Sequence, residues 1–139
     1  MLCEAAAGRR PPGSEMVQRL SPVTLAYLGD AVFEQAARER FLWPPSRMDA
    51  LSSRVRDMVC AEGQHKVLAH LERFGLTDEE HDWLRRGRNA SPRGPRRLEA
   101  KVYRASTAFE CLVGYLHLTD GQRLQDLLDF VFAAWEDEV

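Results

Sequence analysis

Two carboxylates stand in segments of the chain that are otherwise apolar. Asp30 is the only formal charge in residues 22–33, and Glu110 is the only one in residues 105–118. Either acid could lie at the solvent edge of a helix or pair with an arginine, because an unpaired buried carboxylate is costly or becomes protonated. Since the two most apolar segments are expected to pack together, a shared site is the better interpretation. A hard divalent cation such as Mg²⁺ is the ion that such carboxylate oxygens would bind.

Each of these acids has a glycine nearby in the sequence. Gly29 comes directly before Asp30, and Gly114 follows Glu110 by four positions. Because glycine has no side chain, the pair would either allow two helices to approach closely or leave room beside a metal ion. A glycine within a helix can also serve packing alone.

One stretch of the chain carries a concentrated positive charge. Residues 85–104 contain eight basic residues against one acid, Glu99, which gives this segment a net charge of +7 in a chain of net charge −2. The basic residues are Arg85, Arg86, Arg88, Arg93, Arg96, Arg97, Lys101 and Arg104. Such a segment is typical of a site for a polyanion, although a solvated loop interrupted by Gly and Pro would have the same composition. Basic residues beside an acid-bound cation would suit chemistry on a phosphodiester.

Caps and apolar spacing predict that the first half of the chain is helical. Ser21, which stands before a proline, predicts a helix that runs to about residue 40. Ser46 with Asp49 predicts a capping box at the start of a second helix. A bend is expected near Gly63, before a helix over residues 65–74. The buried stripe of the second helix is predicted to be Leu51, Val55, Met58 and Val59.

The second half shows the clearest helical periodicity. Thr77 and Glu80 predict another capping box, and the apolar spacing predicts a helix over residues 98–118 and a final helix after a turn at 119–122. The expected buried residues are Phe109, Leu112, Val113 and Leu116 in the first of these, and Leu124, Leu127, Leu128, Val131 and Phe132 in the second. No segment alternates like a strand, so the chain is predicted to be an all-α domain of six or seven helices.

Length and composition are those of a single globular domain. The chain has 139 residues, of which 45% are hydrophobic and 29% charged. Residues 1–15 are expected to form a flexible tail, and residues 16–139 the folded domain. With no apolar stretch near the roughly 20 residues that cross a bilayer, and no signal peptide, we expect a cytoplasmic protein without membrane association. The three cysteines are too dispersed for a zinc site or a disulfide framework, and Cys111 is expected in the core.

Three motifs together resemble a known family. They are "LAYLGDAVFE" (residues 25–34), "LRRGRNA" (84–90) and "YRASTAFECLVGYLHL" (103–118). In this order they are similar to the ribonuclease III catalytic domain, and most closely to its compact form, Mini-ribonuclease III, which has no double-stranded-RNA-binding domain. The resemblance implies a homodimeric, all-α helical bundle that depends on Mg²⁺, with Mn²⁺ as a substitute, and that acts on double-stranded RNA.

The resemblance also implies which residues act. The metal-binding and catalytic acids of the family fall on Asp30 and Glu110. Larger relatives have two more acids at the positions of Ala26 and Thr107, so the site here is leaner, and the Thr107 hydroxyl is expected to face RNA or a metal-bound water. The implied RNA-binding residues are Arg85, Arg86, Arg88, Asn89, Lys101, Tyr103, Arg104 and Thr107.

The implied function is cleavage of double-stranded regions in structured precursor RNA. The family points to maturation of large-subunit (23S) ribosomal RNA, with products that carry a 5′-phosphate and a 3′-hydroxyl and with a ribosomal protein as a candidate for presenting the RNA. One active site per subunit would cut each strand. An alternative is a catalytically inactive RNA-binding module of a ribosomal particle. A helical DNA-binding regulator would also use the basic segment, but it leaves Asp30 and Glu110 unexplained.

Overall fold

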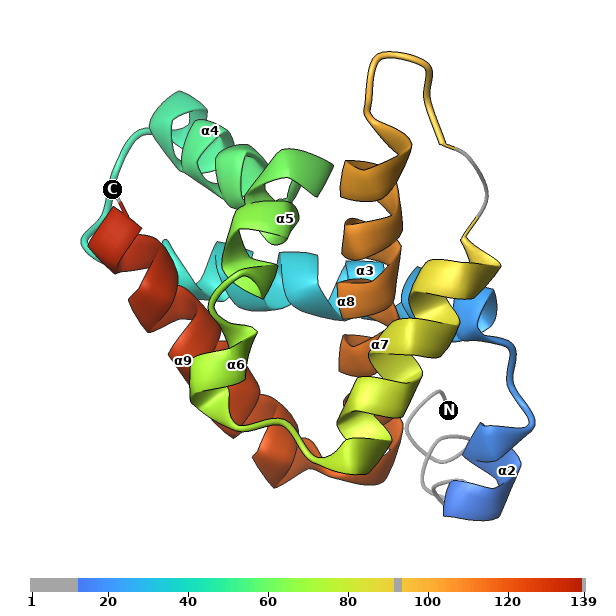
Figure 1. The fold of residues 1–139 in the computed structure, drawn as a ribbon. Helices are drawn as coiled ribbons and strands as arrows, with labels where there is room; N and C mark the ends of the chain where they lie inside the picture. Colours follow the sequence, from blue (N-terminus) through green and yellow to red (C-terminus); the bar gives the residue numbers. More distant parts are fainter. Residues whose placement is uncertain (1–12, 92–93, 139) are drawn as a thin grey trace, which may run out of the picture.

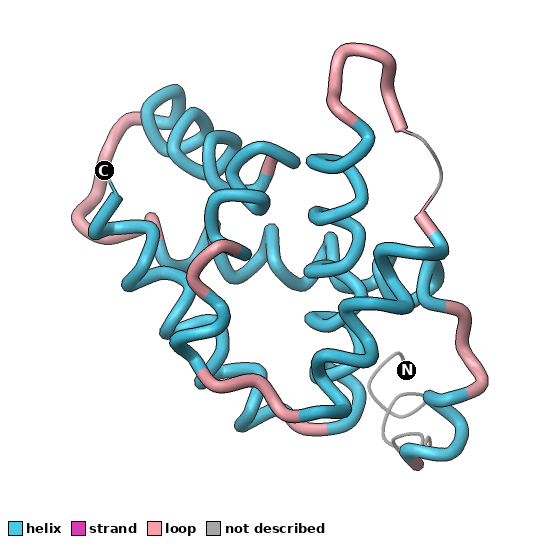
Figure 2. The backbone as a smooth tube through the Cα atoms, viewed as in Figure 1, coloured by secondary structure: helices cyan, strands magenta, loops and turns pink. Residues whose placement is uncertain are grey.

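The computed structural model describes residues 13–91 and 94–138, and within these ranges the fold is helical with no strand (Figures 1 and 2). The helices are α2 (Ser14–Gln18), α3 (Pro22–Arg40), α4 (Met48–Val59), α5 (Ala61–Leu68), α6 (Leu71–Phe74), α7 (Asp78–Ala90), α8 (Ala100–Thr119) and α9 (Gly121–Glu138). The predicted all-α class is therefore confirmed. Among the described helices, none combines the length and apolar character that crossing a membrane requires.

Two of the predicted helix starts are confirmed. The Ser21 hydroxyl accepts a hydrogen bond from the backbone N–H of Thr24 at 3.1 Å, at the start of α3. Thr77 and Glu80 form the reciprocal capping box that begins α7. The predicted box at Ser46 is wrong, because α4 begins two residues later and its N-cap has no side-chain hydrogen bond. The Asp49 carboxylate instead accepts from the N–H of the next residue at 2.9 Å, inside the first turn, where an acid also suits the helix dipole.

The segment after α4 is more broken than its sequence indicates. The bend predicted near Gly63 occurs at Cys60, whose extended backbone ends α4 and begins α5. A Cβ atom on Gly63 would lie 2.3 Å from the carbonyl oxygen of Asp57, so this glycine allows the first turn of α5 to pack on the last turn of α4. The helix predicted over residues 65–74 is two pieces, α5 and the single turn of α6. Gly75 ends α6 with φ +83°, a left-handed conformation that glycine adopts freely.

Helix α8 runs through the centre of the molecule, with α3 crossing behind it and α7 and α5 packed on it (Figure 1). Every residue from Ala105 to Leu116 is buried except Glu110, which is half-buried. All nine apolar residues predicted to be buried in α8 and α9 are in the core, and so is Cys111. The edge of the Phe109 ring meets Phe33 of α3 with 5.0 Å between ring centroids. The most apolar helices thus form the centre, as expected.

Backbone contacts set the crossing of α3 and α8. A Cβ atom on Gly29 would lie 1.8 Å from the carbonyl oxygen of Glu110, and one on Gly114 would lie 2.1 Å from the carbonyl oxygen of Leu25. Neither position has room for a side chain. The interpretation that these two glycines permit close helix approach is therefore confirmed.

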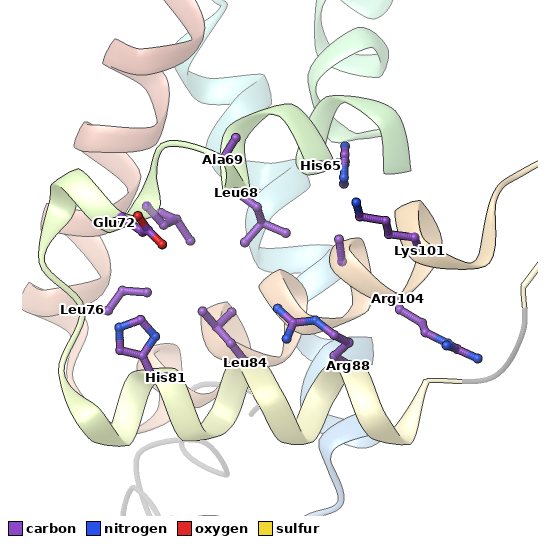
Figure 3. A pocket seen from close by; sticks show the side chains of 12 residues that line it. His65, Leu68, Ala69, Glu72, Leu76, His81, Leu84, Arg88, Lys101 and Arg104 are labelled. Atoms are coloured by element: carbon purple, nitrogen blue, oxygen red, sulfur yellow. The ribbon is translucent and has the colours of Figure 1, made fainter.

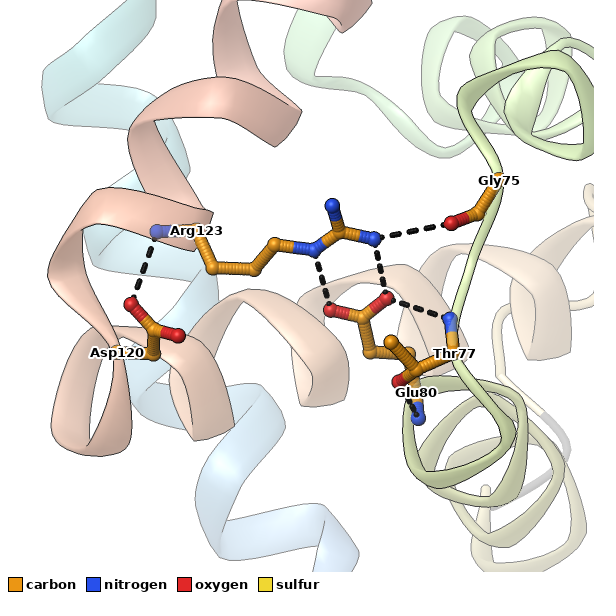
Figure 4. A network of polar contacts seen from close by, with 5 residues as sticks. All are labelled: Gly75, Thr77, Glu80, Asp120 and Arg123. Atoms are coloured by element: carbon orange, nitrogen blue, oxygen red, sulfur yellow. Dashed lines mark hydrogen bonds and ion pairs between the residues drawn. The ribbon is translucent and has the colours of Figure 1, made fainter.

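A buried ion pair joins the start of α7 to the start of α9 (Figure 4). The Arg123 guanidinium donates to both carboxylate oxygens of Glu80 at 2.8 Å, and also to the carbonyl oxygen of Gly75 at 3.0 Å. Glu80 accepts a further bond from the N–H of Thr77. Burial alone would raise the pKa of Glu80, but these hydrogen bonds and the charge of Arg123 leave it below its usual value. The ion pair holds the N-terminal ends of α7 and α9 together.

Candidate active site

Asp30 from α3 and Glu110 from α8 meet at the glycine crossing, and their carboxyl groups share a hydrogen bond. Asp30 is exposed, whereas Glu110 is half-buried. The pKa of Glu110 is raised to about 9, first because burial disfavours its charged form and then because Asp30 bonds to it and repels a second negative charge. The structure thus brings together the two acids that the sequence placed in one site.

The donor set of this site fits a hard divalent cation. Among the residues that the structure describes, no group of three or more His, Cys, Asp or Glu side chains could hold a metal ion. The site therefore has two carboxylates, those of Asp30 and Glu110. A cation such as Mg²⁺ typically binds one or two carboxylates and keeps several waters. Its charge would remove the repulsion that now raises the pKa of Glu110.

Gln64 of α5 is a polar neighbour of this site that sequence reasoning missed. It is 1% exposed, and its side chain lowers the pKa of Glu110 by hydrogen bonding. A signal was present, because Gln64 lies three and four positions before Val67 and Leu68 on the apolar stripe of its helix. A polar residue on the apolar stripe of a helix is expected to be buried together with its apolar neighbours.

Three of the predicted RNA-binding residues line one end of a groove of 530 Å³ between α5, α6, α7 and α8 (Figure 3). Arg88 reaches this end from α7, and Lys101 and Arg104 from the first turns of α8. The other end is bounded by Glu72, Leu76 and His81, and leucines line the middle (Figure 3). The leucines of the groove are Leu68, Leu71, Leu76 and Leu84.

A second hollow of 350 Å³ adjoins this basic end. It is lined by Arg88, Asn89 and Ser91 at the end of α7, and by Arg104 of α8. Arg88 and Arg104 thus border both spaces, and Asn89 joins them in the second. These three predicted residues, with Lys101, form a surface that we call the basic groove, at the N-terminal end of the helix that carries Glu110.

Two arginines of the "RRGR" motif are engaged elsewhere on α7. Arg85 forms an ion pair with Asp82, one turn earlier on the helix. The Arg86 guanidinium lies over the ring of Trp83, with its Cζ atom 4.0 Å from the ring centroid, and its charge acts on the buried Cys111. The structure does not bring Arg85 and Arg86 into the basic groove.

Tyr103 and Thr107 are covered by the connector between α7 and α8. The connector passes over Tyr103, because a Cβ atom on Gly94 would lie 2.4 Å from the ring, and Gly94 has φ +82°. The Thr107 hydroxyl donates to the carbonyl oxygen of Tyr103 at 3.2 Å and accepts from the Ser91 hydroxyl at 3.1 Å. Thr107 is only 7% exposed. Arg93, which belongs to the same basic segment, lies outside the described residues.

Comparison with known proteins assigns the fold and the family. The model of the ribonuclease III domain matches residues 23–121, which include both acids and the whole basic segment. This chain belongs to the ribonuclease III family. A protein named Mini-ribonuclease 3 from Synechocystis is 46% identical over 121 residues, covering 87% of this chain and 84% of the relative. A Mini-ribonuclease 3 from Gloeobacter violaceus is 49% identical over 112 residues, covering 81% and 82%.

A solved structure supports the same fold. The crystal structure of a protein from Fusobacterium nucleatum superposes with a TM-score of 0.75 at 23% identity, covering 88% of this chain and 98% of that one. The curated relatives named Mini-ribonuclease 3 match this ribonuclease III chain over most of their own length. The resemblance to that form, predicted from the three motifs, is confirmed.

The leaner acid set of this ribonuclease III chain has a structural counterpart. Ala26, one turn before Asp30, is buried at 7% exposure. Thr107, one turn before Glu110, holds the connector through Ser91 instead of carrying a charge. Both positions at which the resemblance implies acids in larger relatives thus hold buried, uncharged side chains.

Proposed function

We propose that this endoribonuclease uses Mg²⁺ to hydrolyse double-stranded regions of structured precursor RNA, leaving 5′-phosphate and 3′-hydroxyl ends, and that it acts in maturation of 23S ribosomal RNA. The observation that carries the proposal is the meeting of Asp30 and Glu110, with Asp30 exposed. Helix α8, which carries Glu110, also contributes Lys101 and Arg104 to the basic groove. The names of the curated relatives, each a Mini-ribonuclease 3, support the choice of RNA as substrate.

In this proposal each group of residues has one task. Asp30 and Glu110 would hold the cation, and their separation is fixed by the glycine backbones of the crossing rather than by flexible side chains. A bound Mg²⁺ would neutralise phosphoryl charge and lower the pKa of an attacking water. Arg88, Lys101 and Arg104 would neutralise backbone phosphates of an A-form duplex, which proteins recognise mainly by shape and by contacts to phosphates and 2′-hydroxyls.

An exposed apolar face beside Asp30 supports a homodimer in which each subunit cuts one strand. Tyr27 is 85% exposed and Val23 is 44% exposed, and both belong to the helix that carries Asp30. Residues three and four apart share a helix face, so Tyr27 lies on the same side as Val23 and Asp30. Covering this face with a second copy would place two acid sites near one interface.

The proposal is tested by incubating a long RNA duplex with the protein in Mg²⁺ or in EDTA. We expect cleavage only with Mg²⁺, and a loss of at least about 100-fold in Asp30→Asn and Glu110→Gln, which corresponds to roughly 3 kcal/mol of transition-state stabilisation. Glu34→Gln is the matched control, because Glu34 lies one turn beyond Asp30 and pairs with Arg38 at 3.4 Å on the surface.

Two results would contradict this proposal. If the wild type binds the duplex and never cuts it, the chain is an RNA-binding module. If Asp30→Asn and Glu110→Gln cut normally, the acids are not the catalytic site. Ligation of an adaptor to the products reads the chemistry of both ends, and a 5′-hydroxyl would refute the proposed hydrolysis.

A further inference from the structure

Gln64 contains a buried oxygen without a partner, next to the acid pair. Its side-chain Nε2 donates to the carbonyl oxygen of Val59 at 2.8 Å. Its Oε1 atom is shielded from solvent and makes no hydrogen bond to any described residue. A buried acceptor without a hydrogen bond is unfavourable, so a persistent one calls for an explanation.

The local backbone fixes which way this oxygen points. Val59 is the last residue of α4, and its carbonyl can only accept, so the NH₂ end of the Gln64 amide must face it. Gly63 brings the first turn of α5 against the end of α4, and α5 packs on α8. The same NH₂ group acts on Glu110 as a hydrogen-bond donor. The amide is therefore held between α4 and α8, with its oxygen left over.

The groups that act on Glu110, beside Gln64, include acceptors of hydrogen bonds but no basic side chain that could donate to Oε1. The charge that acts on Glu110 comes from Asp30, and no lysine or arginine of the described residues contributes. Once a cation holds both acids in their ionised form, the two carboxylates are also acceptors. The Gln64 amide of α5 thus lies beside Glu110 of α8, which itself meets Asp30 of α3. A water in the shell of a divalent cation is a donor that would satisfy the Oε1 atom left without a partner.

We propose that Gln64 completes the cation site of this enzyme, with Oε1 accepting a hydrogen bond from a water held by the cation and the NH₂ group orienting Glu110. Gln64 is then a positioning residue, which acts through the water and through Glu110. The proposal rests on the proposed function, because it requires Asp30 and Glu110 to hold a divalent cation.

The experiment measures Mn²⁺ binding without RNA, from the electron paramagnetic resonance signal of the free ion. Gln64→Met removes the oxygen at similar size, Gln64→Glu keeps an oxygen and adds charge, and Gln35→Met on the exposed face of α3 is the control. We expect Gln64→Met to weaken Mn²⁺ binding about tenfold or more. Gln64→Glu should bind Mn²⁺ at least as tightly as the wild type, and Gln35→Met should match it.

Thermal unfolding with and without Mn²⁺ separates a role in the cation site from one in folding. Gln64→Met should show a smaller Mn²⁺-dependent rise in Tm than the wild type, and Gln64→Glu a larger one. Wild-type Mn²⁺ affinity in Gln64→Met, or a weakened affinity in Gln64→Glu, would overturn the proposal. If Gln64→Met does not fold, the result for Gln64→Glu decides alone.

A reference variant distinguishes this proposal from the one on which it rests. Asp30→Asn should abolish Mn²⁺ binding. If it does so while Gln64→Met binds normally, only the role of Gln64 is refuted. If the wild type binds no Mn²⁺, or if Asp30→Asn binds as the wild type does, the cation site fails and the role of Gln64 fails with it.

Discussion

Replacing Gly29 with alanine tests whether backbone contact between α3 and α8 sets both stability and activity. The new Cβ atom would lie 1.8 Å from the carbonyl oxygen of Glu110, whereas carbon and oxygen ordinarily approach no closer than about 3.3 Å. The helices must then separate by roughly 1.5 Å, the difference between these two distances. Because the clash is with backbone, no side-chain rotation relieves it.

This separation has two expected effects. Overpacking of a core costs typically 1–3 kcal/mol, and a backbone clash belongs at the upper end, so we expect a loss of about 3 kcal/mol. In a domain of this size that lowers Tm by roughly 10 °C. Because the carboxyl groups of Asp30 and Glu110 move apart with their helices, cleavage of duplex RNA should fall about 100-fold, the effect of a misplacement of about 1 Å in a catalytic site.

The assay is thermal unfolding followed by circular dichroism, together with duplex cleavage below the Tm of the variant. Gly121→Ala is the control, because a Cβ atom at this first residue of α9 meets no atom within 4 Å. It should change stability by no more than about 0.5 kcal/mol. A Gly29→Ala variant with the Tm of the wild type would refute the contact argument. A lowered Tm with undiminished cleavage would refute the positioning argument.

Three further predictions concern other parts of the chain. Arg123→Ala should reduce the unfolding free energy at pH 7 by about 2 kcal/mol, measured by urea denaturation, because it leaves the Glu80 carboxylate buried and unpaired. The pKa of Glu80 is lowered by folding, so its stabilisation is present above the ordinary value of 4.5 and is lost as pH falls through the folded-state value. Arg88→Ala should weaken duplex binding and reduce the salt slope by about 0.7–0.9, with Arg40→Ala as the control. Burial raises the pKa of the Cys111 thiol to about 12, so iodoacetamide at pH 8 should spare it until the protein unfolds, as read by mass spectrometry.

Each of these has a result that contradicts it. An equal effect of Arg123→Ala at pH 7 and pH 3 would show that the charge of Glu80 is not what Arg123 stabilises. An unchanged salt slope in Arg88→Ala would remove that residue from the RNA contacts. Rapid alkylation of Cys111 in the native state would mean that α7 and α8 open readily.

Local signals account for most of what the sequence predicted of the fold. The caps at Ser21 and Thr77 act on N–H groups within three residues, so their function can be read without knowing the tertiary structure. The box at Ser46 failed because Asp49 lies inside the first turn and bonds to its neighbour instead. The break at Cys60 depends on how α4 and α5 pack around Gly63, which no local pattern reveals.

The same distinction applies to the site. The sequence predicts that Asp30 and Glu110 meet, because the most apolar helices of a small domain pack together at its centre. The apolar stripe signals that Gln64 is buried, but the contact of its side chain with Glu110 appears only in the tertiary structure. Arg86 follows Trp83 by three residues, and side chains three apart share a helix face. The sequence therefore could have predicted that Arg86 packs on Trp83 and does not line the basic groove.

The crossing of α3 and α8 has a consequence for the cell that makes this enzyme. A ribonuclease is synthesised beside ribosomes, which are rich in the structured RNA that such an enzyme attacks. Here the two acids lie eighty residues apart in the sequence, and the packing of α3 on α8, with backbone contact at Gly29 and Gly114, brings them together. Under the proposed function, a nascent or partly unfolded chain keeps Asp30 and Glu110 apart, and the catalytic site forms only when α3 and α8 have packed.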